Sequence, residues 1–177
     1  MKERKLFPMK KFVALLLAAM MVLSCVAALA ESPKKEDLID LIDPPEFFEK
    51  AETQEKAEEL LHKLEGTELD GELDEEDLEK LAEIFGEAEY EVAEAIELKI
   101  TAAGNGEPVK VTFKFPTNFA GKTVAVLFDL DTEHEVVPAT ANEDGTVTVE
   151  FQPELLQKLA DYCAANGSVV ALFLINK

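Results

Sequence analysis

Carboxylate side chains recur at short intervals between Gly66 and Asp77, where their type and spacing could bind a metal ion. Hard divalent cations such as Ca²⁺ take carboxylate and carbonyl oxygens as ligands. Helical patterns precede and follow this stretch, which places the carboxylates in a loop between two helices. The candidate calcium ligands are Glu68, Asp70, Glu72, Asp74 and Asp77.

The stretch is similar to the calcium-binding loop of the EF-hand family. Glu68 and Asp70 match the third and fifth positions of that loop, and Asp74 and Asp77 match the ninth and twelfth. Gly66 stands first, where the family has a carboxylate, and Asp77 is shorter than the bidentate glutamate found last. The resemblance implies weak calcium binding, in the millimolar class, and a plain turn between two helices is the favoured interpretation.

A second group of alternating carboxylates follows the apolar run Val124–Phe128. Asp129, Asp131 and Glu133 are followed directly by His134. Alternate carboxylates converge on a cation where a loop curls, but polar residues are also typical of a solvated hairpin tip. The sequence favours the hairpin tip.

Nucleophilic catalysis finds little support in the sequence. Cys163 lies on the apolar side of a predicted helix, which indicates a buried, inert thiol. Ser32 and Ser168 stand outside any nucleophile-elbow motif, and His62 belongs to the surface of an acidic helix. No phosphate loop and no HExxH motif occurs. We therefore expect a protein without catalytic residues and without a cofactor other than weakly bound Ca²⁺.

Residues 1–30 have the organisation of a secretory signal peptide. Basic residues at the start precede the uncharged apolar run Phe12–Leu23, and Ala28 and Ala30 have the small side chains of a cleavage site. The apolar run is shorter than the ~20 residues of a membrane-spanning helix. One alternative to a cleaved signal is a transmembrane anchor. The other is lipidation: the residues before Cys25 resemble a bacterial lipoprotein box, which implies a lipid anchor at Cys25.

The charge of the chain excludes one class of partner. The formal net charge is −20, and it becomes −24 once residues 1–30, with five basic residues and one acidic residue, are removed. Such a surface repels the phosphates of nucleic acids. We therefore expect no nucleic-acid binding and no membrane span after cleavage, and cationic partners remain open.

The exported part divides by composition into an acidic half, residues 31–97, and a nearly balanced half, residues 98–177. This shift predicts two structural units, an acidic helical extension over residues 31–91 and a β-sandwich domain over residues 92–177. Apolar residues at helical spacing predict helices over Pro45–Leu64 and Asp74–Phe85, and Ser32–Asp43 is predicted to be a short helix or a tether. Asp74 is suited to cap the helix over Asp74–Phe85. The last two helices are predicted to form an acidic helical hairpin that extends from the rest of the chain.

From Val92 onward the apolar period changes from 3.6 to 2, which predicts antiparallel strands joined by turns. A helix over Pro153–Asn166 precedes the last strand. The segments Val109–Pro116, Gly121–Phe128, Glu135–Thr140 and Asp144–Phe151 resemble small immunoglobulin-like β-sandwich domains of secreted and surface proteins of Gram-positive bacteria. The resemblance covers residues 96–175 and implies an extracellular structural or binding module, with no functional residues to carry over. The helix before the last strand departs from that pattern.

These observations predict an α+β protein, with the acidic helical hairpin followed by an antiparallel immunoglobulin-like β-sandwich. The predicted function is that of a secreted, non-catalytic interaction or structural module with a protein or surface partner. The alternative is a weak calcium-responsive module at residues 66–77, and a carboxylate-based hydrolase is the third possibility.

Overall fold

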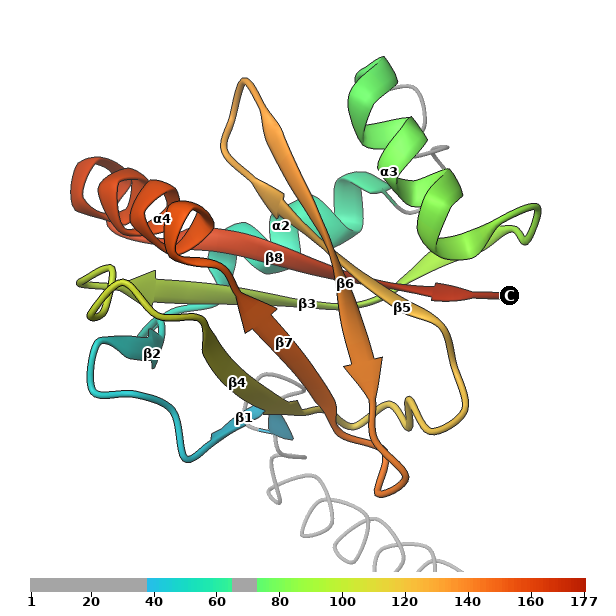
Figure 1. Ribbon diagram of the computed structural model, residues 1–177, viewed down its shortest axis with the longest axis horizontal. Helices are drawn as coiled ribbons and strands as arrows, with labels where there is room; N and C mark the ends of the chain where they lie inside the picture. The colour runs from blue at the N-terminus through green and yellow to red at the C-terminus, as the bar shows by residue number, and fades with distance from the viewer. Residues whose placement is uncertain (1–37, 65–72) are drawn as a thin grey trace, which may run out of the picture. The chain divides into compact units, whose positions relative to one another are not determined.

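The computed structural model describes residues 38–64 and 73–177. The described residues belong to one compact unit. Within the described residues the strands belong to a single antiparallel sheet of eight strands, in the order β1-β4-β7-β6-β5-β8-β3-β2 (Figure 1). Three short helices accompany this sheet.

The strands are β1 (Asp40–Ile42), β2 (Phe48–Lys50), β3 (Tyr90–Ile100), β4 (Val109–Lys114), β5 (Val124–Asp129), β6 (His134–Ala141), β7 (Val147–Phe151) and β8 (Val169–Asn176). The helices are α2 (Glu55–Leu64), α3 (Glu75–Phe85) and α4 (Pro153–Asn166). Strand β3 is the longest and pairs with β8 along most of its length, with a bulge between Val92 and Glu94.

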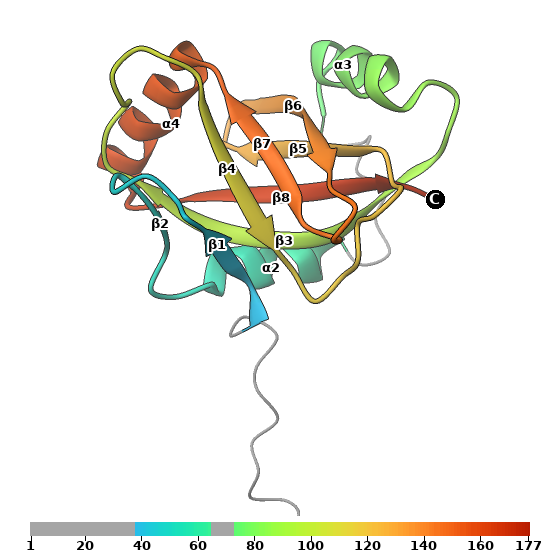
Figure 2. The ribbon, with the colours of Figure 1, turned by 60° about the horizontal axis from the view of Figure 1, so that its bottom comes forward.

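The sheet curls until its two end strands nearly meet, so that it resembles a barrel. Among the strands of residues 38–64 and 73–177, short β1 pairs only with β4, and short β2 pairs only with β3. The Nζ atom of Lys50 in β2 donates a hydrogen bond of 2.9 Å to the carbonyl oxygen of Ile39, just before β1. Figure 2 shows β4 and β7 crossing in front of β3 and β8, with α4 at one end of the curled sheet. Both end strands are too short to offer a long unpaired edge to another chain.

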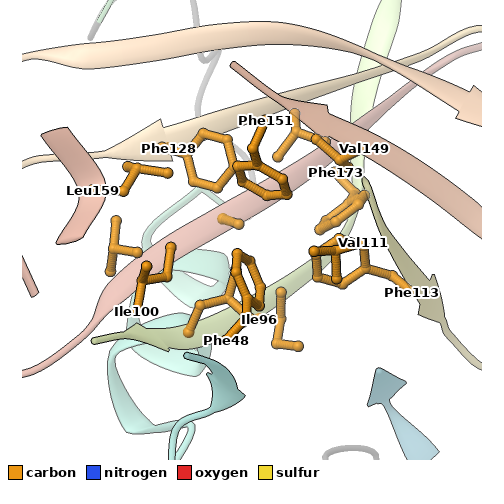
Figure 3. Packing of buried hydrophobic residues seen from close by; sticks show 14 of the residues in the cluster. Phe48, Ile96, Ile100, Val111, Phe113, Phe128, Val149, Phe151, Leu159 and Phe173 are labelled. Carbon is orange, nitrogen blue, oxygen red and sulfur yellow. The ribbon is translucent and has the colours of Figure 1, made fainter. Parts of the chain in front are cut away.

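Aromatic rings fill the inside of the sheet (Figure 3). Phe173 of β8 lies 5.0 Å from Phe113 and 4.6 Å from Phe115, measured between ring centroids. Phe151 of β7 contacts Phe48 of β2 and Phe128 of β5 in the same way. Edge-on and tilted ring pairs of this kind stabilise beyond the area that they bury. Leu155, Leu156, Leu159 and Cys163 of α4 complete this core.

A second apolar layer covers the outside of β3, β5, β6 and β8. The strands contribute small and aliphatic side chains, among them Ala95, Leu127 and Leu172. Helix α2 adds Ala57 to this layer, and α3 adds Leu81 and Phe85. Strands β5 and β8 are therefore buried on both faces, which explains their nearly continuous apolar sequences.

The predicted immunoglobulin-like β-sandwich with an acidic helical hairpin in front of it is wrong. The strands form one curled sheet instead of two facing sheets, because β6 joins β5 to β7 and links every strand into one ladder. Helices α2 and α3 pack on the outside of the sheet and do not extend from it. Two stretches predicted as helix, around Asp40–Ile42 and Phe48–Lys50, are strands, because pairing with β4 and β3 outweighs their local helical pattern.

Other local predictions are confirmed. Helix α3 begins after Asp74, whose side chain accepts a hydrogen bond from the Asp77 backbone N–H, and it ends at Gly86 with a positive φ of 64°. Helix α4 spans Pro153–Asn166 as predicted. These features depend on capping and turn residues close in sequence, so tertiary contacts did not alter them.

Candidate functional site

A cleft of about 370 Å³ lies where α2, α4, β8 and the turn between β5 and β6 come together. This volume is at the lower end of the range typical of small-molecule sites. The cleft contains apolar side chains and charged side chains of both signs. Its lining comprises Lys56, Glu59, Leu60, Lys63, Asp129, Asp131, Tyr162, Asn166, Ser168 and Val170.

Helix α2 presents one face to the cleft, because Lys56, Glu59, Leu60 and Lys63 recur at helical spacing. The Lys56 ammonium donates hydrogen bonds of 3.0 Å to Ser168 Oγ and 3.2 Å to the carbonyl oxygen of Asn166. Its nitrogen also lies 3.9 Å from the Glu97 carboxylate. The Lys56 head group is thus fixed in place although about half of the side chain is exposed.

Buried polar groups hold the start of α2 on β3. The side-chain amide of Gln54 donates to the carbonyl oxygen of Glu97 (3.0 Å) and accepts from the backbone N–H of Glu97 (2.7 Å). This amide therefore pairs with β3 as another strand residue would, next to the end of β2. The Glu97 carboxylate accepts a 3.2 Å hydrogen bond from the backbone N–H of Lys56 and another from the Ser168 hydroxyl. A carboxylate in this position also interacts favourably with the N-terminal dipole of α2.

The acidic side of the cleft is built by the turn after β5. Asp131 has a positive φ of 67° and its backbone N–H donates 3.0 Å to Asp129 Oδ1. The Tyr162 hydroxyl of α4 donates 2.8 Å to Asp131 Oδ2. Burial raises the pKa of Tyr162, and the hydrogen bond to Asp131 raises it further, so the phenol keeps its proton. Among the described residues, Asp129 Oδ2 and Asp131 Oδ1 accept no hydrogen bond.

A chain of hydrogen bonds runs from Lys56 through Ser168 to Glu97, and it resembles part of a catalytic site with a serine nucleophile. Ser168 is 7% exposed, and its hydroxyl donates to Glu97 while it accepts from Lys56. The Glu97 carboxylate is itself engaged by the backbone of α2. The three groups therefore link α2, β3 and β8, and we interpret the chain as a structural connection.

The candidate calcium ligands fall in two places. Glu68, Asp70 and Glu72 lie outside the described residues. Asp74 caps α3, and Asp77 is buried beneath that helix, where its Oδ2 lies 3.4 Å from His134 Nδ1. Within residues 38–64 and 73–177, no group of three or more His, Cys, Asp or Glu side chains is placed to hold a metal ion. Calcium binding at residues 66–77 stays a prediction.

The second predicted carboxylate group is divided by the structure. Asp129 and Asp131 line the cleft, whereas Glu133 forms a 3.1 Å ion pair with Lys158 of α4. His134 lies between Asp77 and Asp129, with its Nε2 3.9 Å from Asp129 Oδ1.

The Cys163 thiol is buried as predicted, and burial raises its pKa. Exposed His62 is also where the sequence placed it.

Sequence reasoning did not identify the cleft as a site. Lys56 is far in sequence from Tyr162 and Ser168, and only the fold brings it beside them. The helical spacing of the α2 residues was visible, but it also describes an ordinary solvated helix face. Nothing in the sequence indicated which element would lie opposite.

Comparisons with protein-family models, curated protein sequences and solved structures find no match. They neither support nor oppose a relationship to immunoglobulin-like or EF-hand proteins. No helix in the described parts of the chain is long and apolar enough to cross a membrane.

Replacement of Gln54 tests the attachment of α2 to the sheet. Gln54→Ala leaves the buried backbone N–H of Glu97 without its partner, which costs about 1–3 kcal/mol, whereas the Glu97 carbonyl keeps a 2.9 Å hydrogen bond from the Ala51 backbone N–H. We expect a loss of at least that size in the free energy of unfolding, measured in urea. The control is Gln157→Ala, which removes an exposed hydrogen bond to Asp161 and should change stability by less than about 0.5 kcal/mol. Equal effects would show that the amide does not hold α2.

The buried carboxylate of Asp77 predicts a dependence of stability on pH. Burial raises the pKa of Asp77, the nearby Asp74 raises it further, and His134 and Lys80 act in the opposite direction. Because the pKa of Asp77 is higher in the folded state than in the unfolded state, the folded protein binds the proton more tightly. The Asp77 side chain therefore lowers the free energy of unfolding as the pH rises above about 4. Relative to wild type, Asp77→Asn should therefore gain stability with rising pH, as measured by thermal unfolding between pH 4 and 7. Asp161→Asn, at an exposed position on α4, should show no such trend.

Proposed function

We propose that the protein is an exported, non-catalytic binding module of the bacterial exterior, and that its ligand binds in the cleft between α2 and the β5–β6 turn. The observation that carries this proposal is the construction of the cleft. Helix α2, the β5–β6 turn and the consecutive elements α4 and β8 meet there, and they combine charged groups held in place with apolar residues. A site that binds a ligand needs this combination of shape, apolar contact and a few oriented polar groups.

The rigidity of the cleft supports binding. Lys56 is fixed by Ser168 and Asn166, and Asp131 is fixed by Tyr162 and by its own turn. Polar groups that are already oriented lose little conformational freedom when a ligand arrives. The aromatic core, in contrast, fills the inside of the sheet, so we place the ligand on the outside.

A binding role is favoured over the hydrolase that the sequence left as a third possibility. The polar groups of the cleft are engaged with one another: Ser168 with Glu97 and Lys56, and Tyr162 with Asp131. These bonds stabilise the junction of α2, β8 and α4. Catalysis by Ser168 would require them to be exchanged for bonds to a substrate.

Export is tested at the N-terminus of the protein produced by bacterial cells. The signal-peptide pattern predicts that mass spectrometry of the extracellular fraction finds a chain beginning at Glu31. A membrane-bound chain beginning at a lipid-modified Cys25 would support export by the alternative route. Intact chain that begins at Met1 and remains in the cytoplasm would contradict the proposal.

Binding is tested with a set of small molecules of differing charge and polarity, monitored by amide NMR spectra of the exported protein. Leu60→Trp places a large ring in the cleft without changing its charge, so it should abolish shifts caused by ligands that bind there. The matched control is Leu38→Trp, at an exposed position before β1, which should leave binding unchanged. If no compound shifts the resonances of the cleft residues in the wild type, the proposed site is wrong.

A further inference from the structure

The charges around the cleft indicate which class of ligand it takes. This inference rests on the proposed function, because it names the ligand of the same cleft. The carboxylates of Asp129 and Asp131 stand on the side formed by the β5–β6 turn. The side formed by α2 carries the ammonium groups of Lys56 and Lys63 together with the carboxylate of Glu59. Among the described residues, Lys56 forms no ion pair with Asp129 or Asp131; its ion-pair partner is Glu97.

The acidic side is able to receive a cationic group. Asp129 and Asp131 each use one oxygen within the turn and against Tyr162, and each has a second oxygen without a hydrogen bond from the described residues. An ammonium group carries three N–H donors and accepts nothing, so it matches two neighbouring carboxylates with spare acceptors.

The basic side is able to receive an anionic group. The Lys56 ammonium uses two of its donors on Ser168 Oγ and the Asn166 carbonyl, whereas Glu97 lies beyond hydrogen-bond distance at 3.9 Å. One donor is thus left for a ligand in a side chain that is 51% exposed. Lys63, two turns further along α2, adds positive charge to the same side.

The lining also includes Leu60 of α2 and Val170 of β8, which offer apolar contact. A ligand that matches all three features carries an ammonium group, a carboxylate and a small apolar body. We propose that the cleft binds a zwitterion of the α-amino-acid class. Its ammonium lies against Asp129 and Asp131, its carboxylate lies towards Lys56, and its side chain contacts Leu60 and Val170.

The test uses three probes with the same side chain: leucine, leucine amide and N-acetyl-leucine. Only leucine carries both charges, since the amide lacks the carboxylate and the acetyl compound lacks the ammonium group. Titration of the exported protein at low ionic strength, followed by amide NMR, should show leucine shifting the resonances of the cleft residues. Each singly charged analogue should bind at least about tenfold more weakly, since it loses the charged hydrogen bonds to one side of the cleft.

Asp131→Asn tests the acidic side with little change in shape. Asparagine tolerates the positive φ at this position, and its amide oxygen still accepts from Tyr162. We expect about tenfold weaker leucine binding. The matched control is Glu143→Gln, which removes one negative charge at an exposed position in the turn at the other end of β6. It should leave leucine binding unchanged.

The outcomes separate this inference from the proposed function. Leucine amide that binds as tightly as leucine would show that the cleft takes simple cations, and the inference would be overturned. The same holds if Asp131→Asn and Glu143→Gln weaken binding equally, because the effect would then be one of net charge. If other small molecules shift the cleft residues and leucine does not, the zwitterion is wrong and the binding module stands.

Discussion

The structure depends on the closure of one antiparallel sheet around a core of phenylalanine rings. Phe48, Phe113, Phe128, Phe151 and Phe173 come from five different strands and meet inside the curl. A flat sheet would hold these rings apart. In the curled sheet they lie on the concave face and fill the space that the sheet encloses. The short strands β1 and β2 are the two ends of this sheet, and they lie on opposite sides of the gap where the curled sheet nearly closes.

The outer face of β3, β5 and β8 is also apolar and must be covered. This need to bury a second apolar surface positions the helices. Helix α2 covers one part of that face and α3 another. The cost of placing Glu97 beneath α2 is offset by hydrogen bonds from Ser168 and the Lys56 backbone, since a buried carboxylate without partners is strongly unfavourable. The same bonds fix Lys56 at the edge of the cleft, so the packing of the outer layer also prepares the proposed site.

The turn after β5 connects the charged lining of the cleft to the charged side chains of α3 and α4. Asp129 lines the cleft and also lies near His134, which reaches Asp77 under α3. Asp131 bonds to Tyr162, and Glu133 pairs with Lys158, so both residues connect this turn to α4. The turn therefore joins α3, α4 and the cleft through side chains only a few residues apart. The sequence marked these residues as alternating carboxylates, but their different partners arise from the curl of the sheet.

The sequence by itself determined the features that depend on neighbouring residues. The capping of α3 by Asp74, the extent of α4, the main strands from β3 to β8 and the burial of Cys163 could all be predicted, because each follows from local backbone preference or from the spacing of apolar residues. Tertiary structure decided the rest. Alternation identifies a strand but not its neighbour, so it could not distinguish two facing sheets from one closed sheet, nor could it show that Asp40–Ile42 pairs with β4. The cleft was likewise hidden, because Lys56, Asp131 and Ser168 approach one another only when α2 packs on the outside of the barrel and β8 returns beside β5.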